Sequence, residues 1–132
     1  MSDTRIDDPV RRLVRRGAVT VFPEATLREV AVVMDLEEVG AVVVVAEGRS
    51  VGVLSERDLV RAVAAGDDVD DVRAEDVMAM EVVTVALDDT VADAATGMLD
   101  GAIRHLPVVD GEAVVGVVSI RDVLQAYLTE GP

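Results

Sequence analysis

The sequence predicts a mixed α/β (α+β) fold built from two copies of a β-α-β-β-α unit. One observation is an internal repeat, because residues 17–63 align without a gap on residues 81–127. The other is that each copy alternates valine-rich runs, which favour strands, with segments whose apolar residues recur at helical spacing. A unit this long that occurs only twice indicates two fused copies of one small domain, and not a solenoid array.

The repeat does not follow from valine content alone. Many aligned positions hold identical residues that are not valine, and they lie at an offset of 64 from their partners: Thr20, Thr26, Ala31, Met34, Gly52, Ser55, Arg57, Asp58 and Ala62. Hydrophobic residues make up 51% of the chain and aromatic residues only 2%. We therefore expect a core of Val, Ala, Leu and Met, in which two halves too small to be stable alone pack on each other.

The first copy begins with a short strand at 18–22, which ends at Pro23. Thr26 and Glu29 form the pattern of a capping box and open a helix. This helix is expected to run to Val39 or Gly40, where glycine can adopt the left-handed geometry that ends helices. A continuous apolar run too short for a core helix, 41–46, predicts a strand covered on both faces.

A turn at 47–49 then leads to a hairpin partner strand at 51–54, and Ser55 caps a second helix that runs to about Ala65. The second copy repeats the pattern, with strands at 82–86, 106–109 and 114–118 and helices at 90–101 and 119–128. Pro9–Arg16 is expected to be a short helix that begins at proline. The domain boundaries predicted from these elements are 1–65 for the N-terminal helix with the first domain, 66–76 for a solvated acidic linker, and 77–132 for the second domain.

Composition excludes several classes of function. The chain has no cysteine, and its only histidine is His105; a disulfide, a thiolate nucleophile and a zinc site are therefore not expected. A phosphate-binding GxxxxGK loop is impossible because the chain has no lysine. Neither Ser55 nor Ser119 has a histidine at a repeated position to act as its base, so we expect no enzymatic activity.

The net charge is −14, and all twelve basic residues are arginine. A strong negative field disfavours nucleic acids and anionic membrane surfaces as partners. No apolar run is long enough to span a membrane, and no signal sequence is found at the N-terminus, so we expect a cytoplasmic protein. The acidic, lysine-free composition is either an adaptation to a high-salt (halophilic) cytoplasm or a consequence of GC-rich codon usage.

A polar tetrad occurs at the same point of each copy. It is Ser55-Glu56-Arg57-Asp58 in the first and Ser119-Ile120-Arg121-Asp122 in the second, each separated by one residue from a valine-glycine-valine run. A serine followed three residues later by an acid is close to a capping box and could serve only to start a helix. Its occurrence at equivalent points of both copies favours contact with a ligand in at least one of them.

These motifs resemble tandem CBS domains, named after cystathionine β-synthase. The resemblance rests on Val19-Thr20-Val21 and Val83-Thr84-Val85, on the segment from Ile103 to Asp110, and on the Val-Gly-Val-Val-Ser-x-Arg-Asp segment at 115–122. It covers about residues 8–128. It implies a regulatory module in which two domains pack sheet to sheet about a pseudo-twofold axis and leave two clefts.

Members of this family commonly bind AMP, ADP, ATP or S-adenosylmethionine in those clefts, and no other cofactor is expected. The resemblance assigns ribose contacts to Ser55 and Asp58 in one copy and to Ser119 and Asp122 in the other. An ionised carboxylate on the first turn of a helix can accept two hydroxyl hydrogens, and the helix N-terminus suits a phosphate oxygen. The further residues expected to bind ligand are Thr20, Arg57, Thr84, Arg104, His105, Pro107 and Arg121.

The two sites are not expected to be equivalent. Arg104 and His105 stand where family members carry basic residues that reach phosphates, but the first copy has Gly40 and Ala41 there. Pro107 likewise has no counterpart, since the first copy has valine at that position. Phosphate recognition is therefore expected to differ between the two clefts.

The sequence thus predicts a non-catalytic, energy-sensing module that binds an adenosine compound and regulates an unidentified protein. The alternative is a ligand-free interaction module that docks on an enzyme or transporter. The nucleotide-binding module is expected to be a homodimer that buries the apolar helix faces of Leu27, Val30 and Met34 and of Leu59 and Val63 with their second-copy equivalents.

Overall fold

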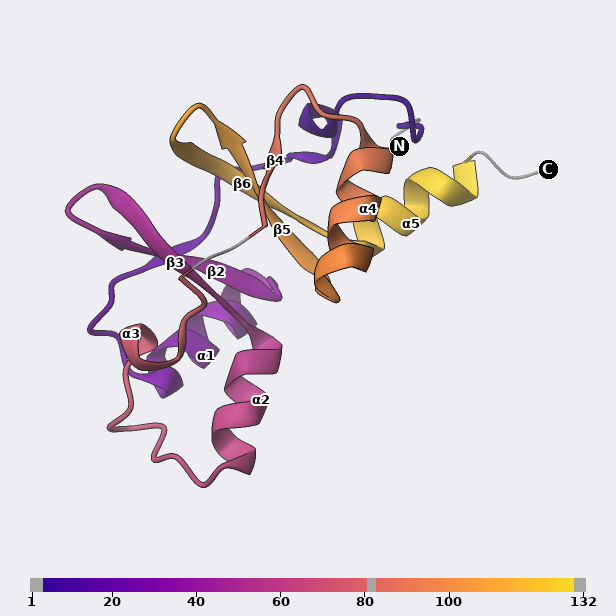
Figure 1. The fold of residues 1–132 in the computed structure, drawn as a ribbon. Helices are drawn as coiled ribbons and strands as arrows, with labels where there is room; N and C mark the ends of the chain where they lie inside the picture. Colours follow the sequence, from indigo (N-terminus) through magenta and orange to yellow (C-terminus); the bar gives the residue numbers. More distant parts are fainter. Residues whose placement is uncertain (1–3, 81–82, 130–132) are drawn as a thin grey trace. The chain divides into compact units, whose positions relative to one another are not determined.

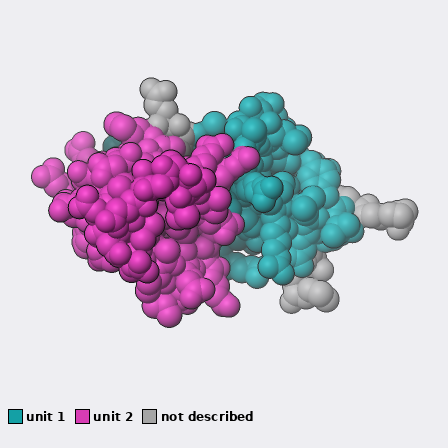
Figure 2. Space-filling view, turned by 90° about the horizontal axis from the view of Figure 1, so that it is seen from below, with its two compact units in different colours: residues 1–17, 83–132 teal, residues 18–82 magenta. Residues whose placement is uncertain are grey.

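The computed structural model describes residues 4–80 and 83–129, which belong to two compact units (Figures 1 and 2). Unit 1 comprises residues 1–17 and 83–132, and unit 2 comprises residues 18–82. Each unit contains a three-stranded sheet and helices, so the predicted mixed α/β fold class is confirmed.

Unit 2 is built around the sheet β1-β2-β3. The central strand β2 (Ala41–Ala46) pairs in parallel with β1 (Thr20–Val21) and antiparallel with β3 (Arg49–Ser55). The parallel pair requires a crossover connection, which is helix α1 (Leu27–Glu37). Helix α2 (Glu56–Ala64) follows β3, and a short helix α3 (Ala74–Val77) comes after it.

Unit 1 repeats this sheet as β4-β5-β6. Strand β5 (His105–Asp110) pairs in parallel with β4 (Val85–Ala86) and antiparallel with β6 (Ala113–Ser119). Helix α4 (Val91–Gly101) connects β4 to β5, and α5 (Ile120–Thr129) follows β6. The strand expected at 82–86 is shorter in the structure, and Val82 lies outside the described residues. The expected N-terminal helix is a single 3₁₀ turn, η1 (Val10–Leu13).

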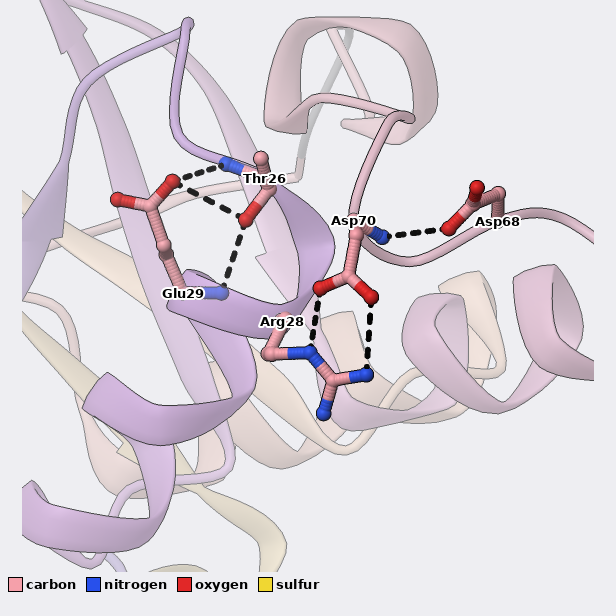
Figure 3. Close-up of polar contacts among 5 residues, drawn as sticks. All are labelled: Thr26, Arg28, Glu29, Asp68 and Asp70. Atoms are coloured by element: carbon pink, nitrogen blue, oxygen red, sulfur yellow. Dashed lines mark hydrogen bonds and ion pairs between the residues drawn. The ribbon is translucent and has the colours of Figure 1, made fainter.

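Threonine capping boxes begin α1 and α4, as the sequence predicts. In unit 2 the Thr26 hydroxyl accepts from the Glu29 backbone N–H at 3.2 Å, while the Glu29 carboxylate accepts from the Thr26 N–H at 3.1 Å (Figure 3). Thr90 and Asp93 repeat the arrangement in unit 1, at 3.1 and 2.9 Å. Each box satisfies two N–H groups at a helix start that have no intrahelical partner.

The end of α1 differs from the expectation. The left-handed conformation falls on Glu38, with φ of 55°, and not on Gly40. Ala102 takes the equivalent position after α4, with φ of 52°. Its N–H bonds the Leu99 and Met98 carbonyls, just as the Glu38 N–H bonds those of Asp35 and Met34. Hydrogen bonds to the last turn of each helix therefore hold non-glycine residues in a conformation they rarely adopt.

Each unit has its own apolar core between one face of its sheet and its helices. The core of unit 2 is formed by Val21, Leu27, Val30, Met34, Val42, Val44, Leu54, Ala62 and Ala74. The core of unit 1 is formed by Val10, Leu13, Val85, Val91, Ala94, Ala95, Met98, Leu106, Val108, Val118, Val123 and Ala126. Because Val, Ala, Leu and Met fill both cores, the expected core composition is confirmed.

The placement of Leu27, Val30 and Met34 corrects the expected dimer surface. Their exposed fractions are 1%, 0% and 6%, and all three belong to the core of unit 2. They are therefore not available to form an interface with a second copy of the chain. The apolar side chains that α1 and α2 do expose are Val32, Leu36, Val60 and Val63.

The repeat extends further upstream than the alignment of 17–63 on 81–127 indicates. At the same offset, η1 (Val10–Leu13) aligns with α3 (Ala74–Val77). We call residues 4–17 the first lead-in segment and residues 66–80 the second. The first belongs to unit 1 and so packs with the body of the second repeat, whereas the second belongs to unit 2 with the body of the first repeat.

This division differs from the boundaries 1–65, 66–76 and 77–132 that the sequence suggests. The N-terminal residues do not join the first copy, because Val10 and Leu13 are part of the core of unit 1. The segment 66–76 is also more than a solvated linker. Its acids are exposed, but Val69 and Val72 pack against the core of unit 2 and Ala74 is fully buried.

Matching backbone hydrogen bonds hold both lead-in segments. In unit 2, Ala74 N donates to Ala25 O and Leu27 N donates to Val72 O, at 2.8 and 3.0 Å. The equivalent bonds in unit 1 join Val10 N to Asp89 O at 2.7 Å and Val91 N to Asp8 O at 3.0 Å. Since Leu27 and Val91 are the first residues of α1 and α4, the lead-in carbonyls satisfy N–H groups that these helices leave unpaired.

A matched glycine lets each lead-in segment approach the sheet. A Cβ atom on Gly52 would lie 2.6 Å from Met78 Sδ and 2.9 Å from the carbonyl oxygen of Ala79. On Gly116 it would lie 2.7 Å from Val14 Cγ1, with the nearest backbone atom, the Arg16 oxygen, at 3.5 Å. The glycines identical in the two copies are therefore explained by close packing and not by backbone conformation.

Pro107 explains a difference between the two sheets. In unit 2 the equivalent residue, Val43, donates its N–H to Val19 O at 2.9 Å, and β1 pairs from Thr20 onward. Proline has no N–H, so this bond cannot form in unit 1. Strand β4 accordingly starts one position later, at Val85, which pairs with Val108.

Candidate functional site

The two tetrads form the same hydrogen-bonded arrangement at the start of α2 and α5. In unit 2, Asp58 Oδ2 accepts from Ser55 N at 2.8 Å and from Ser55 Oγ at 3.0 Å, and Asp58 N donates to Ser55 Oγ at 3.4 Å. In unit 1 the corresponding distances between Ser119 and Asp122 are 2.9, 3.0 and 3.3 Å. Both pairs therefore cap a helix.

Capping uses only one oxygen of each aspartate. Within the described residues, Oδ1 of Asp58 and Oδ1 of Asp122 accept no hydrogen bond from the chain. Both carboxylates are half-buried, so they are reachable and fixed in direction by the cap. Each site therefore presents one carboxylate oxygen that can accept a hydrogen bond from a ligand hydroxyl.

The residues before the central strand lie directly beside each tetrad. Arg104 O accepts from Ile120 N at 2.7 Å, and His105 pairs in register with Ser119 across the β5-β6 ladder. In unit 2, Gly40 O accepts from Glu56 N at 2.9 Å, and Ala41 takes the register position opposite Ser55. The structure thus brings Arg104 and His105 to the Asp122 site and places residues without basic side chains at the equivalent position of the Asp58 site.

Thr20 and Thr84 lie at the same end of their sheets as the tetrads. Thr20 pairs with Val43, two residues along β2 from Ala41, and Thr84 directly precedes β4. Thr20 is the first residue of β1, so both threonines lie at the beginning of the first strand of their copy. Both side chains are exposed.

Arg57 and Arg121 lie on the first turns of α2 and α5 and are exposed. Neither forms an ion pair with another described residue.

Pro107 lies in the middle of β5 in register with Val117, between Leu106 and Val108, which point into the core of unit 1. Successive strand residues point to opposite faces, so its ring lies on the face of the sheet away from that core.

Sequence reasoning missed the contribution of the first lead-in segment. Thr4, Leu13 and Arg15 line a shallow pocket together with four residues of α5, namely Asp122, Gln125, Ala126 and Thr129. All of these residues belong to unit 1. Extending the internal alignment upstream to residue 10 would have indicated that this segment is part of the repeat.

Comparisons with known proteins agree with this architecture. The sequence pattern of the CBS domain matches residues 10–65 and 74–129, which together make up most of the chain. The chain belongs to the CBS domain family. The resemblance inferred from the sequence is thereby confirmed, and each match begins at the first residue of η1 or α3, within the lead-in segments.

The chain is similar to proteins of several organisms. An uncharacterized protein of Methanopyrus kandleri is 39% identical over 119 residues, which cover 88% of this chain and 61% of that protein. The chain thus spans less than two thirds of the length of this relative. The solved structure of a CBS domain protein from Pyrobaculum aerophilum complexed with AMP has a TM-score of 0.80 and 36% identity, covering 91% of this chain and 98% of that one.

A second solved structure is the CBS domain pair of protein MJ0100 in complex with 5′-methylthioadenosine and S-adenosyl-L-methionine. It has a TM-score of 0.82 and 25% identity, and the alignment covers 90% of this chain and 98% of that one. The comparisons support a regulatory, ligand-binding module as the class of this CBS pair.

Among the described residues, no helix is long and apolar enough to cross a membrane, and no group of three or more acidic or histidine side chains could hold a metal ion.

Proposed function

We propose that the chain is a non-catalytic, cytoplasmic sensor module that binds an adenosine compound, such as AMP, ADP, ATP or S-adenosylmethionine. The observation that carries the proposal is the pair of equivalent aspartates, each held by a serine cap through Oδ2 with Oδ1 left to accept. A ribose offers two adjacent hydroxyl groups, which suit a fixed, charged acceptor. The AMP and S-adenosylmethionine complexes of similar proteins support this choice of ligand.

The residues proposed to contact ligand are the two tetrad aspartates and the side chains that the sequence motifs single out around them. Asp58 and Asp122 accept from ribose hydroxyls, and the serines fix their direction. The remaining proposed contacts, which orient the base or hold charged groups, are Thr20, Arg57, Thr84, Arg104, His105, Pro107 and Arg121. A ligand shifts the equilibrium between two conformations of a protein only if it binds one of them more tightly. The regulated partner protein, which is unidentified, would respond to the resulting change in conformation.

Calorimetric titration of Asp58→Asn and Asp122→Asn tests the proposal. Asparagine keeps one carbonyl oxygen for the serine cap but replaces the second carboxylate oxygen with an N–H donor, which a ribose hydroxyl cannot use as an acceptor. We expect each variant to keep its melting temperature within a few degrees and to lose about tenfold or more in affinity at its own site.

The matched control is Asp93→Asn. Asp93 forms the same kind of capping box with Thr90 at the start of α4, away from the tetrads. It should cost a similar small amount of stability and leave ligand affinity unchanged. Absence of heat with AMP, ATP and S-adenosylmethionine in the wild-type protein would contradict the proposed function and favour the ligand-free interaction module.

We also propose that the chain forms a homodimer through α2 and α5. These helices expose apolar side chains at equivalent positions, with Val60 66% and Leu124 54% exposed, and Val63 62% and Tyr127 42% exposed. Apolar side chains repeated on both helices suit an interface between copies of the chain. Sedimentation equilibrium should give twice the monomer mass, and the double variant Val63→Asp with Tyr127→Asp should be monomeric.

A further inference from the structure

The pocket between the first lead-in segment and α5 places two opposite charges beside each other. Its polar side chains are Thr4, Arg15, Asp122, Gln125 and Thr129, and all of them belong to unit 1. Arg15 and Asp122 share this pocket without forming an ion pair. The guanidinium therefore keeps its donors for another acceptor, while the aspartate keeps Oδ1 for another donor.

Arg15 differs in this respect from neighbouring arginines of the same segment. Arg11 pairs with Asp88, and Arg12 Nη1 lies 3.2 Å from Asp8 Oδ2. Arg15 makes no side-chain hydrogen bond or ion pair with any described residue, although the chain carries 26 acidic residues. Within residues 4–80 and 83–129, its charge is thus not already neutralised by a partner.

The rest of unit 1, residues 83–132, also contributes arginines near the start of α5. Only two arginines occur between residues 83 and 132, namely Arg104 and Arg121. Arg104 precedes β5 and bonds Ile120 through its carbonyl, and Arg121 lies one residue before Asp122. Neither makes an ion pair within the described part of the chain. Arg15 thus shares a pocket with Asp122, and Arg104 and Arg121 lie on segments that join the start of α5 through the backbone.

Unit 2 lacks this arrangement. At the offset of 64, Arg15 corresponds to Ala79 and Thr4 corresponds to Asp68, while Arg104 corresponds to Gly40. Ala79 is fixed by two backbone bonds to Val53, at 3.0 and 2.9 Å, so the backbone of the lead-in segment is held there without a charged side chain. The two aspartates thus have the same cap and different charged surroundings.

We infer that Arg15 is a specificity-determining residue of the Asp122 site. It holds the anionic group of an adenosine compound, a phosphate or a carboxylate, while the ribose hydroxyls donate to Asp122. The Asp58 site, with alanine at the equivalent position, discriminates less between charged and neutral adenosine compounds. This inference rests on the proposed function and adds to it the part of the ligand that each site selects.

Titration of Arg15→Ala in an Asp58→Asn background tests the inference at the Asp122 site alone. The ligands are two matched pairs, AMP with adenosine and S-adenosylmethionine with 5′-methylthioadenosine. We expect Arg15→Ala to weaken binding of the charged ligand about tenfold in at least one pair and to change that of its neutral partner less than about twofold. The pair that responds tells whether the anion is a phosphate or a carboxylate.

Two variants and a salt series provide controls. Arg12→Ala removes the same charge from the same segment but from a side chain paired with Asp8, and it should leave the ratio of charged to neutral affinity unchanged. Ala79→Arg, in an Asp122→Asn background, should raise that ratio at the Asp58 site. Because salt screens charges, the affinity of wild type for the charged ligand should fall with KCl more steeply than that of Arg15→Ala.

The outcomes separate the two hypotheses. If the wild-type protein binds none of the four ligands, the proposed function is wrong, and the role inferred for Arg15 is then wrong too. If the ligands bind but Arg15→Ala weakens charged and neutral compounds equally, the role assigned to Arg15 alone is overturned. The same holds if Arg12→Ala and Arg15→Ala act alike.

Discussion

Units 1 and 2 have nearly the same backbone and different side chains around their aspartates. Their sheets share one strand order, and their caps share three hydrogen bonds at distances that agree within 0.1 Å. Arg15, Arg104 and His105 of unit 1, however, have Ala79, Gly40 and Ala41 as equivalents in unit 2. Duplication has thus preserved the means of fixing a carboxylate, and divergence has changed the charge that surrounds it.

The units also differ in how the chain builds them. Unit 2 is one continuous stretch, whereas unit 1 combines residues 1–17 with residues 83–132. The lead-in segments nevertheless make equivalent backbone bonds in both units. The same packing can therefore form with a lead-in segment that is adjacent in sequence, as in unit 2, or distant in sequence, as in unit 1. Removal of the N-terminal segment should accordingly affect unit 1 and not unit 2.

Removal of residues 1–17 should have the largest effect. It takes Val10 and Leu13, which are 0% and 8% exposed, out of the core of unit 1. Burial of each side chain stabilises by about 1.5–3 kcal/mol, a large part of the stability of a small domain. Hydrogen exchange should show unit 1 unprotected and unit 2 still protected; equal loss of protection in both units would contradict the independence of their cores.

Substitution of the two matched glycines should come next. Gly52→Ala forces its new Cβ against the Ala79 carbonyl oxygen at 2.9 Å, which is backbone and cannot turn away. Gly116→Ala meets Val14 Cγ1 at 2.7 Å, a side chain that can move. We expect destabilisation of about 2–3 kcal/mol for Gly52→Ala and about 1 kcal/mol for Gly116→Ala in urea unfolding. The reverse order would contradict the conclusion that Gly52 makes the less adaptable contact.

Pro107→Val should make the sheet of unit 1 more like that of unit 2. The new N–H can donate to the first strand as Val43 N donates to Val19 O. The expected gain is about 0.5–1.5 kcal/mol, with slow amide exchange at position 107. The mirror variant Val43→Pro should remove the bond in unit 2 and shift the start of its first strand, and fast exchange at position 107 of Pro107→Val would count against this explanation.

The smallest effect concerns an ion pair found in unit 2 alone. Arg28 Nε and Nη2 donate to the two carboxylate oxygens of Asp70, the second bond measuring 3.1 Å (Figure 3). The hydrogen bond and the charge of Arg28 lower the pKa of Asp70 below its usual 3.8. Stability from this pair is therefore complete above pH 3.8 and is lost as the pH falls through the lowered pKa.

Carboxyl NMR titration checks this prediction. In Arg28→Ala the pKa of Asp70 should rise toward its ordinary value, and the unfolding free energy near neutral pH should change little because both side chains are exposed. Asp71, which forms no ion pair within the described residues, serves as a reference carboxyl. A pKa of Asp70 that is the same in both proteins would show that the pair does not persist in solution.

Local signals predicted most of the secondary structure. The capping pattern of Thr26 and Glu29, the valine run of β2 and the turn after it depend on neighbouring residues, and the structure has each of them. The position of Glu38 in the left-handed region was missed, because glycine preference points to Gly40 and only the hydrogen bonds of the last helical turn select Glu38. The helix at Ala74–Val77 was missed because four residues show no periodicity.

The candidate site was predictable where the repeat is visible in the sequence. Ser119 and Asp122 form the expected cap, and His105, which was expected near a ligand, lies opposite Ser119. Arg15 could not be predicted, because its proximity to Asp122 depends on a packing of distant segments that leaves no local pattern. The burial of Leu27, Val30 and Met34 in the core of unit 2 could not be predicted for the same reason. An apolar stripe on a helix indicates that this face is buried, but not whether the same domain or a second copy buries it.

The discontinuity of unit 1 has a consequence for synthesis of the chain. Residues 18–82 leave the ribosome together and hold every strand and helix of unit 2, so this unit can form before translation ends. Val10 and Leu13 leave earlier but find their apolar partners only after β5, β6 and α5 have followed. A nascent chain stalled between these stages would leave Val10 and Leu13 without their core partners, in a segment that is also rich in arginine.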